Sequence, residues 1–147
     1  MENVDEIRIC PEDPEGDERL ADRETSYAMN GYLGVVIDIN LGNGKRLKNV
    51  HGAVKKLRQI KSTSKTMAMF EATENVHLDH IHSYDWFSEN NINDESVFDA
   101  VASEVAVHRH GGSTANYLYL DGHVESLTSE QINEWSLEPF NFAKPQE

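Results

Sequence analysis

The stretch RHGGSTANYLYLDGHVESL, residues 109–127, decides the expected fold of this chain. Its dipeptide Asp121-Gly122 is typical of a two-residue type I′ hairpin turn, because both central positions of that turn need positive φ. Tyr and Leu are concentrated in the segment from Ala115 to Leu120, which favours a strand before the turn. The segment from His123 to Leu127 is then the return strand. We therefore predict a β-hairpin centred on Asp121-Gly122.

The segment before this hairpin is expected to add a third strand. Two valines share one face of residues 105–110, and Gly111-Gly112-Ser113-Thr114 is typical of a turn. The prediction is a β-meander over residues 105–127. In that meander His110 and Asp121 lie at opposite ends of the middle strand, about 20 Å apart. They cannot share a metal ion there, and only Asp121 and His123 flank the same turn.

Two more strand regions are indicated upstream. Aromatic and β-branched residues at 26–39 favour a strand, with Asn30-Gly31 as a turn. GNGK at 42–45 indicates a further turn, and it lacks the glycine and the Ser or Thr that would complete a phosphate-binding loop. KTMAMFEATE at 65–74 is predicted to form a strand with two methionines on one face.

Two helices are expected beside these strands. Apolar residues at helical spacing predict a short amphipathic helix over residues 50–61. Thr128 or Ser129 is expected to cap a second helix whose body runs from Glu130 to Trp135. The predicted fold class is α+β, with an antiparallel sheet of four to six strands and a short amphipathic helix.

Two segments are expected to be loops. Residues 11–26 are rich in Pro, Gly and acidic side chains, and residues 75–98 mix histidines, acids and asparagines without a regular period. The acidic loop has several carboxylates that offer oxygen ligands for Ca²⁺, although they lack the fixed spacing of a loop built for that ion, and a solvated acidic loop explains them equally. The carboxylates are those of Glu12, Asp13, Asp17 and Glu18.

Composition limits the classes of function. The chain has 147 residues, 38% of them hydrophobic, and a formal net charge of −13, which is typical of one soluble domain covering residues 1–147. Nucleic acid is excluded as a partner because its phosphates require clustered Lys and Arg, and the single basic run at 55–61 is interpreted as a solvated face.

No segment is long and apolar enough to span a membrane, and the acidic N-terminus does not have the order of a signal peptide. Cys10, the single cysteine, is interpreted as a packed thiol.

HLDHIH at 77–82 is the best metal candidate by spacing. His77 and His80 meet on one face of a helix, whereas His80 and His82 share one face of a strand, and Asp79 or Asp85 supplies oxygen. Binding of a divalent metal, Ca²⁺ or Zn²⁺, or metal-dependent hydrolysis is therefore one alternative function, with His77, His80 and His82 as ligands and His108 as a further candidate. A polar surface loop with solvated histidines explains the same pattern.

A recognition module for a glycan or a protein is a further alternative. It would use the acidic residues 11–18 and the loop 75–98, in which Trp86 precedes Phe87. Trp86 with Phe87, and Tyr117 with Tyr119, would then form an exposed aromatic surface. Core packing and cross-strand pairing explain the same residues.

The sequence also resembles a protein family. RHGGSTANYLYLDGHVES resembles the C-terminal signature of the prepilin-type, His-x9-Asp-Gly domain proteins of planctomycete-type bacteria. Three other segments are similar to landmarks of that family and follow in the same order: ICPEDP (9–14), TSYAMNGYLG (25–34) and IKSTSKTMAMFEATEN (60–75). Together the four segments span residues 9–127.

The resemblance implies a pilin-head-like domain with a structural role and no catalytic activity. Its partners would be other pilin-like subunits or cell-envelope proteins of a type IV pilus or a type II secretion-like system, and no cofactor is implied. Glu71 would be a structural carboxylate that holds a backbone amide or a neighbouring arginine such as Arg109. Asn30 with Gly31, His110 with Gly111 and Gly112, and Asp121 with Gly122 and His123 would be structural motif residues.

The chain departs from the family pattern at two places. Ten residues rather than nine separate His110 from Asp121, so the turn at 111–114 carries one extra residue. Members of the family begin with a prepilin leader and a long apolar helix that anchors the precursor in the inner membrane, whereas this sequence begins almost directly at ICPEDP. We expect either the soluble part of a longer cell-envelope product or a variant without the anchor, in which this chain itself does not contact the membrane.

Overall fold

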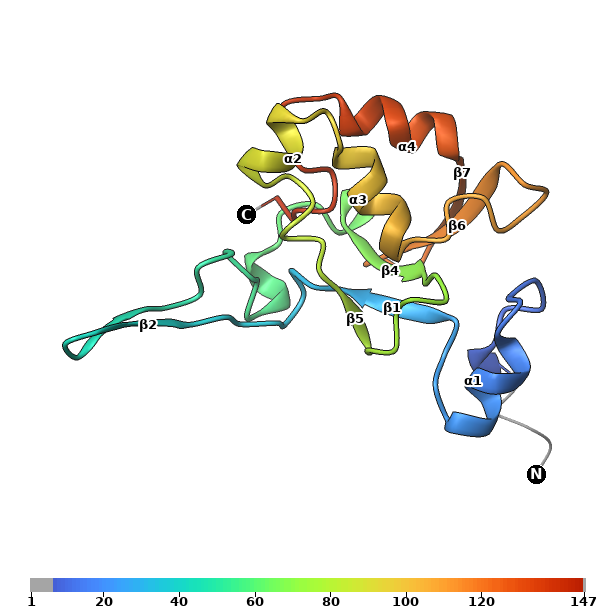
Figure 1. The fold of residues 1–147 in the computed structure, drawn as a ribbon, viewed down its shortest axis with the longest axis horizontal. Coiled ribbons are helices and arrows are strands. Elements are labelled where there is room, and N and C mark those ends of the chain that lie inside the picture. The colour runs from blue at the N-terminus through green and yellow to red at the C-terminus, as the bar shows by residue number, and fades with distance from the viewer. Residues whose placement is uncertain (1–6, 147) are drawn as a thin grey trace.

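The computed structural model describes residues 7–146 and has an α+β fold built on one sheet (Figure 1). The sheet has five strands in the order β5-β1-β4-β6-β7, and a separate hairpin, β2-β3, projects from this body. The strands are β1 (Tyr27–Asn30), β2 (Ile39–Gly42), β3 (Lys45–Leu47), β4 (Met67–Glu71), β5 (His80–Ile81), β6 (Thr114–Tyr119) and β7 (Val124–Thr128). The helices are α1 (Gly16–Asp22), α2 (Glu89–Asn93), α3 (Val97–Glu104) and α4 (Ser129–Ser136).

The sheet is mixed rather than antiparallel. Strands β1, β4, β6 and β7 pair antiparallel in sequence, as predicted, but β5 pairs parallel with β1 through Met29 opposite His80. This edge strand has two residues within the segment 75–98, which was predicted to be a loop. A strand this short has no periodic pattern, and its place is set by the neighbouring β1 rather than by its own sequence.

The hairpin β6-β7 confirms two strands of the predicted meander. Tyr117 lies opposite Glu125, and residues 115, 117 and 119 of β6 point into the core while the residues between them are partly exposed. The turn differs from the predicted type I′ turn. Of the two central residues, only Gly122 has positive φ, at 94°. The backbone N–H of Tyr119 donates to the carbonyl of His123, and the carbonyl of Tyr119 accepts from Gly122, so three residues connect the strands. Gly122 supplies the positive φ that such a connection needs.

The predicted strand over residues 105–110 is wrong. Helix α3 ends at Glu104, Val105 forms an isolated bridge with Ala72, and a turn follows before His110. The third strand beside β6 is instead β4, where Phe70 lies opposite Tyr117. Val105 and Val107 are buried in the core although they belong to no strand, and periodicity alone does not separate a strand from such an irregular segment.

Helices α2, α3 and α4 cover one face of the sheet, and the core lies between the two layers (Figure 1). The ring of Phe70 meets those of Trp86 and Tyr117 edge-on, with centroids 5.6 and 5.9 Å apart. Trp86, Tyr117 and Tyr119 are buried, so core packing is confirmed for them and the exposed aromatic surface is not formed. A cap was expected at Thr128 or Ser129, and Thr128 caps α4 through a capping box with Gln131.

Two other predicted elements are wrong. Residues 50–61 contain no α-helix: Gly52 has φ of 70°, Val54 donates to the carbonyl of Tyr32, and Leu57 is exposed whereas Val54 and Ile60 are buried. Tertiary contacts have overridden a pattern of only three or four apolar residues. Conversely, the loop predicted at 11–26 contains α1, because Asp17 and Glu18 favour its first turn and Arg19 becomes a buried anchor.

None of the helices formed by residues 7–146 is long and apolar enough to cross a membrane.

Candidate functional site

Residues of three of the four resemblance segments, together with Arg19 of α1, meet where the N-terminal segment packs against the end of the sheet. We call this site the junction and define it by Cys10, Asp13, Arg19, Glu71, Arg109 and His110. Its centre joins Glu71, at the end of β4, to His110, in the turn before β6. His110 Nε2 lies 2.7 Å from the Glu71 carboxylate and 3.9 Å from Cys10 Sγ. Sequence reasoning missed the Cys10 contact because the two residues are 100 positions apart.

Glu71 is the buried carboxylate that the sequence predicted. Its side chain is 1% exposed, and Oε2 accepts a 2.9 Å bond from the backbone N–H of Asn116 while Oε1 faces His110. One buried carboxylate therefore links β4, β6 and the turn before β6. The arginine predicted to hold it does not: Arg109 Nη1 lies 2.7 Å from Asp13 instead.

A second set of charges ties α1 to the same place. One carboxylate oxygen of Asp13 forms an ion pair with Arg109, and the other lies 3.1 Å from Arg19 Nε. Both arginine side chains are 3% exposed. Arg19 also donates to the carbonyls of Thr73 and Val76 at 2.6 and 2.9 Å. Buried ions need such partners, and removal of one would leave the others uncompensated. The acidic segment therefore serves as an attachment, with Asp13 committed to two arginines rather than free for Ca²⁺.

The pKa directions at the junction follow from these contacts. The bond to Glu71 raises the pKa of His110, against the effect of burial, and Glu12 adds to it at 3.3 Å from Nδ1. Burial disfavours the charged form of Asp13, but bonds from Ser26 and Arg109 outweigh it and lower the pKa of that carboxyl. Burial raises the pKa of the Cys10 thiol, so it is a poor nucleophile in this state.

Asn30 crosslinks the strand end of β1 to three other segments. It is fully buried and donates to the carbonyls of Met67 and Ala143 at 2.8 and 2.7 Å, and it accepts from the Ser83 hydroxyl at 2.7 Å. It also begins the predicted turn, since Leu33 donates to its carbonyl. Gly31 is required beside it because a Cβ there would overlap the carbonyl oxygen of Ile81.

The other predicted motif residues belong to turns. Gly111 and Gly112 have φ of 61° and 75° and shape the chain between His110 and β6. At the other end of β6, Asp121 lies 2.5 Å from His123, whose ring stacks on Tyr119 at 4.3 Å. The hydrogen bond that His123 donates to the Asp121 carboxylate raises the pKa of His123. This pair is exposed and fixes the turn.

The three histidines of the segment 77–82 line one shallow depression with Glu104, but each Nδ1 contacts a different carboxylate. His77 lies 3.3 Å from Glu24, His80 2.8 Å from Asp79, and His82 2.7 Å from Glu104. The rings of His80 and His82 are 5.5 Å apart. Among residues 7–146, the one group of three ligand atoms within 4.8 Å of one another belongs to Cys10, Glu71 and His110.

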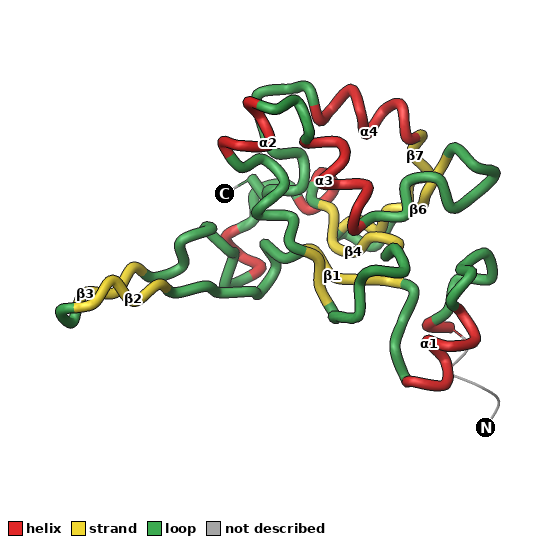
Figure 2. Tube along the Cα trace, viewed as in Figure 1, coloured by secondary structure: helices red, strands yellow, loops and turns green. Residues whose placement is uncertain are grey.

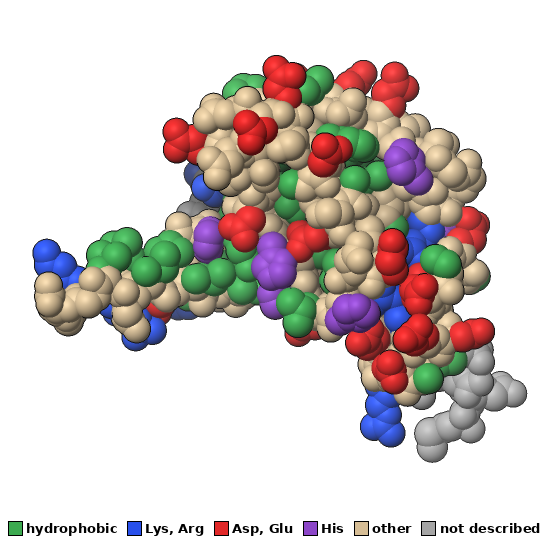
Figure 3. Space-filling model, viewed as in Figure 1, with side chains coloured by type: hydrophobic (Ala, Val, Ile, Leu, Met, Phe, Trp, Pro, Cys, Tyr) green, Lys and Arg blue, Asp and Glu red, His purple; other side chains and the backbone are tan. Residues whose placement is uncertain are grey.

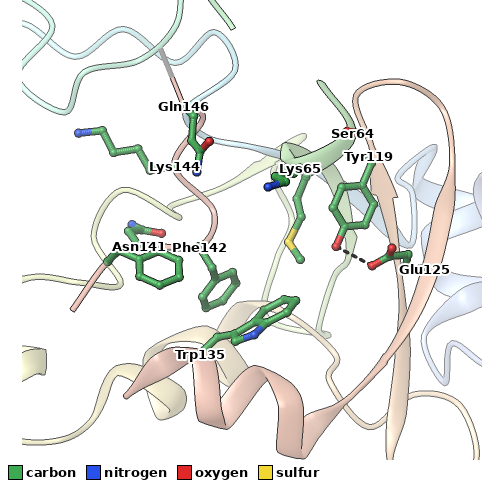
Figure 4. A pocket seen from close by; sticks show the side chains of 11 residues that line it. Ser64, Lys65, Tyr119, Glu125, Trp135, Asn141, Phe142, Lys144 and Gln146 are labelled. Carbon is green, nitrogen blue, oxygen red and sulfur yellow. Dashed lines mark hydrogen bonds between the residues drawn. The ribbon is translucent and has the colours of Figure 1, made fainter. Parts of the chain in front are cut away.

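A cavity of about 430 Å³ lies between α4, β6 and the C-terminal segment (Figure 4). Trp135 and Phe142 form its aromatic wall, Tyr119 donates to Glu125 at 3.0 Å, and the ammonium groups of Lys65 and Lys144 stand at its edge. Sequence reasoning missed this cavity because its walls come from separate segments. An aromatic wall with a few polar groups is typical of small-ligand pockets.

The β2-β3 hairpin forms a projecting arm, residues 36–50 (Figure 2). Residues 39–48 are all exposed, including Ile39, Leu41 and Leu47 at 44, 56 and 49%. Charge is also segregated: residues 31–70 have eight Lys or Arg and one Asp, a net charge of +7, whereas the rest of the chain has a net charge of −20. Figure 3 shows hydrophobic side chains along one side of the arm and acidic side chains over the helical layer.

Comparison of the chain with protein-family models, with curated proteins and with solved structures found no match.

Proposed function

We propose that this chain is the head domain of a pilin-like structural subunit and has no catalytic role. The observation that carries the proposal is the arm: a two-stranded hairpin that exposes three large apolar side chains far from the core. An isolated hairpin is at best marginally stable in water, and exposed apolar surface of this kind is typical of protein contacts. The arm is therefore an element for assembly.

The junction supports the same function. Its carboxylates and guanidinium groups are committed to one another or to backbone groups, as Glu71 is to Asn116 and Asp13 is to Arg109. A catalytic centre needs a group held ready for substrate, whereas these groups hold the N-terminal segment on the sheet. This supports the structural role that the resemblance implies for the same residues.

The test is the intact mass and cell fraction of the native gene product. We expect a larger, membrane-associated species with an apolar N-terminal helix, of which this chain is the outer domain. A product of this length in the cytoplasmic fraction would contradict the proposal.

A second candidate function is divalent-metal binding at the junction. Cys10, Glu71 and His110 offer sulfur, oxygen and nitrogen within 4.8 Å, and zinc accepts all three ligand types. The metal would compete with the His110–Glu71 ion pair because Nε2 must lose its proton.

Zinc content after dialysis tests this second function. One zinc retained per chain, and lost in Cys10→Ser, would support the junction as a metal site. Retention in Cys10→Ser with loss in His80→Ala would move the site to His77, His80 and His82. A chain that retains no zinc contradicts both metal hypotheses.

A further inference from the structure

The arm carries apolar and positive groups together. Ile39 lies opposite Leu47 in the β2-β3 ladder, so the two side chains share one face of the hairpin. Arg46 is paired with Asp38 at 2.7 Å, whereas Lys45 and Lys48 are exposed beside the apolar residues. A surface that fits the arm must therefore be apolar and bordered by acidic groups.

A groove with this chemistry lies on the helical layer of the same chain. It has a volume of about 370 Å³ and is formed where α2, α3 and the end of α4 meet. Its lining residues are Ile92, Glu95, Val97, Phe98, Asn133, Ser136, Leu137, Glu138 and Pro139. Ile92 and Leu137 are 54 and 73% exposed, so their apolar surface is open to a partner.

The border of this groove is acidic. Glu95 and Glu138 line it and are exposed. All residues that line the groove come from the segment 66–143, and the one Lys or Arg in that segment is Arg109. Arg109 is bound to Asp13 at the junction, so it does not offset the charge of the groove. The groove and the arm therefore match in apolar character and are opposite in charge.

We propose that the arm of one copy docks in the α2-α3-α4 groove of a second copy, with Lys45 and Lys48 facing Glu95 and Glu138. This inference rests on the proposed structural function and names the contact that would join the subunits. Contact between two different patches is heterologous, so each bound copy presents a free arm and a free groove, and the assembly extends as an open chain or closes as a ring. An arm-to-arm dimer would place Lys45 and Lys48 against their own copies, which the charge disfavours.

The test measures self-association of the chain by sedimentation velocity over a range of concentrations. We expect concentration-dependent association at about 0.05 M salt that weakens at about 0.5 M, because the ionic part of the contact is screened. K45E with K48E, and separately E95K with E138K, are each expected to weaken association about tenfold or more. An equimolar mixture of the two variants is expected to associate again, since every arm then meets a groove of opposite charge.

The double variant K55E with K56E is the matched control for the arm variant, because it lowers the net charge by the same amount at exposed lysines outside the arm. It is expected to associate like the native chain. Association that persists unchanged in both the arm and the groove variants would overturn this contact while leaving the structural function standing. A native chain that stays monomeric, or whose arm binds anionic vesicles instead, would also overturn the contact. The cell fraction of the native product decides the structural function separately.

Discussion

At the junction, charged side chains lie inside the protein beside partners of opposite charge, whereas on the arm apolar side chains lie outside without a covering layer among the described residues. Glu71 and Asp13 are buried, and Ile39, Leu41 and Leu47 are exposed. Both regions reverse the usual distribution of residues between core and surface. The difference teaches that the junction holds the N-terminal segment to the sheet, whereas the apolar side chains of the arm are left exposed for the contact proposed above.

Glu71→Ala should have the largest effect on stability. It leaves the Asn116 N–H without its acceptor and His110 without its buried partner, so the free energy of unfolding is expected to fall by about 3 kcal/mol or more. Urea unfolding measures this. Glu12→Ala is the control, because Glu12 contacts the same imidazole from an exposed position and should cost below about 1 kcal/mol. Equal losses in the two variants would remove the distinction between the buried and exposed partners.

The pH dependence of stability should sharpen the same distinction. The folded-state pKa of His110 is raised above its ordinary value of 6.5, so its stabilising effect is complete below about pH 6.5 and is lost as the pH rises through the folded value. The urea midpoints of the native chain and of His110→Gln should therefore converge as the pH rises from about 6.5 through the raised folded-state pKa. His108→Gln changes an exposed histidine two positions away and should follow the native curve. A gap between native and His110→Gln that does not change with pH would contradict the ion pair.

Replacement of Ile39, Leu41 and Leu47 together by Thr should leave the body intact. These side chains are about half exposed, so the free energy of unfolding is expected to change by less than about 1 kcal/mol. Ile132→Ala, at a fully buried position in α4, should cost about 2 to 5 kcal/mol and is the contrasting control. A comparable loss in the arm variant would mean that the arm is part of the core.

Tyr117→Phe should have the smallest effect. The Tyr117 hydroxyl is buried and has no hydrogen-bond partner within residues 7–146, so its removal is expected to change stability by less than about 0.5 kcal/mol or to increase it. Tyr119→Phe is the matched control, since it loses a bond to Glu125 and should cost about 1 kcal/mol. Thermal unfolding of both variants compares them; a larger loss for Tyr117→Phe would reveal a partner for that hydroxyl.

Local signals predicted the local parts of this fold. The strands β6 and β7, the turn at Asp121-Gly122 and the Thr128 cap depend on residues a few positions apart, and these were placed within one or two residues. Helix α3 was missed although its apolar pairs, such as Val97 with Val101, repeat at a spacing of four. The valines that follow it share one face at strand spacing and favour a strand over residues 105–110, which the structure does not form.

The candidate site was predicted only in part for the same reason. Glu71 was expected to hold a backbone amide or a neighbouring arginine such as Arg109; it accepts from the backbone N–H of Asn116, whereas Arg109 turns to Asp13 instead. The contact of Cys10 with His110 and the groove of the helical layer join distant segments. No periodic pattern records which distant segments meet, so these features appear only in the folded chain.

The two sides of the junction lie far apart in the sequence, and this separation also affects the order of folding. Cys10 and Asp13 emerge early in synthesis, but their partners His110 and Arg109 follow about 100 residues later. At typical translation rates the N-terminal segment waits on the order of 5 to 20 s for these partners. Contacts of such high sequence separation are slow to form, so the docking of α1 on the sheet should be a late step in folding. Until then the acidic segment of residues 11–26 is accessible to chaperones and proteases.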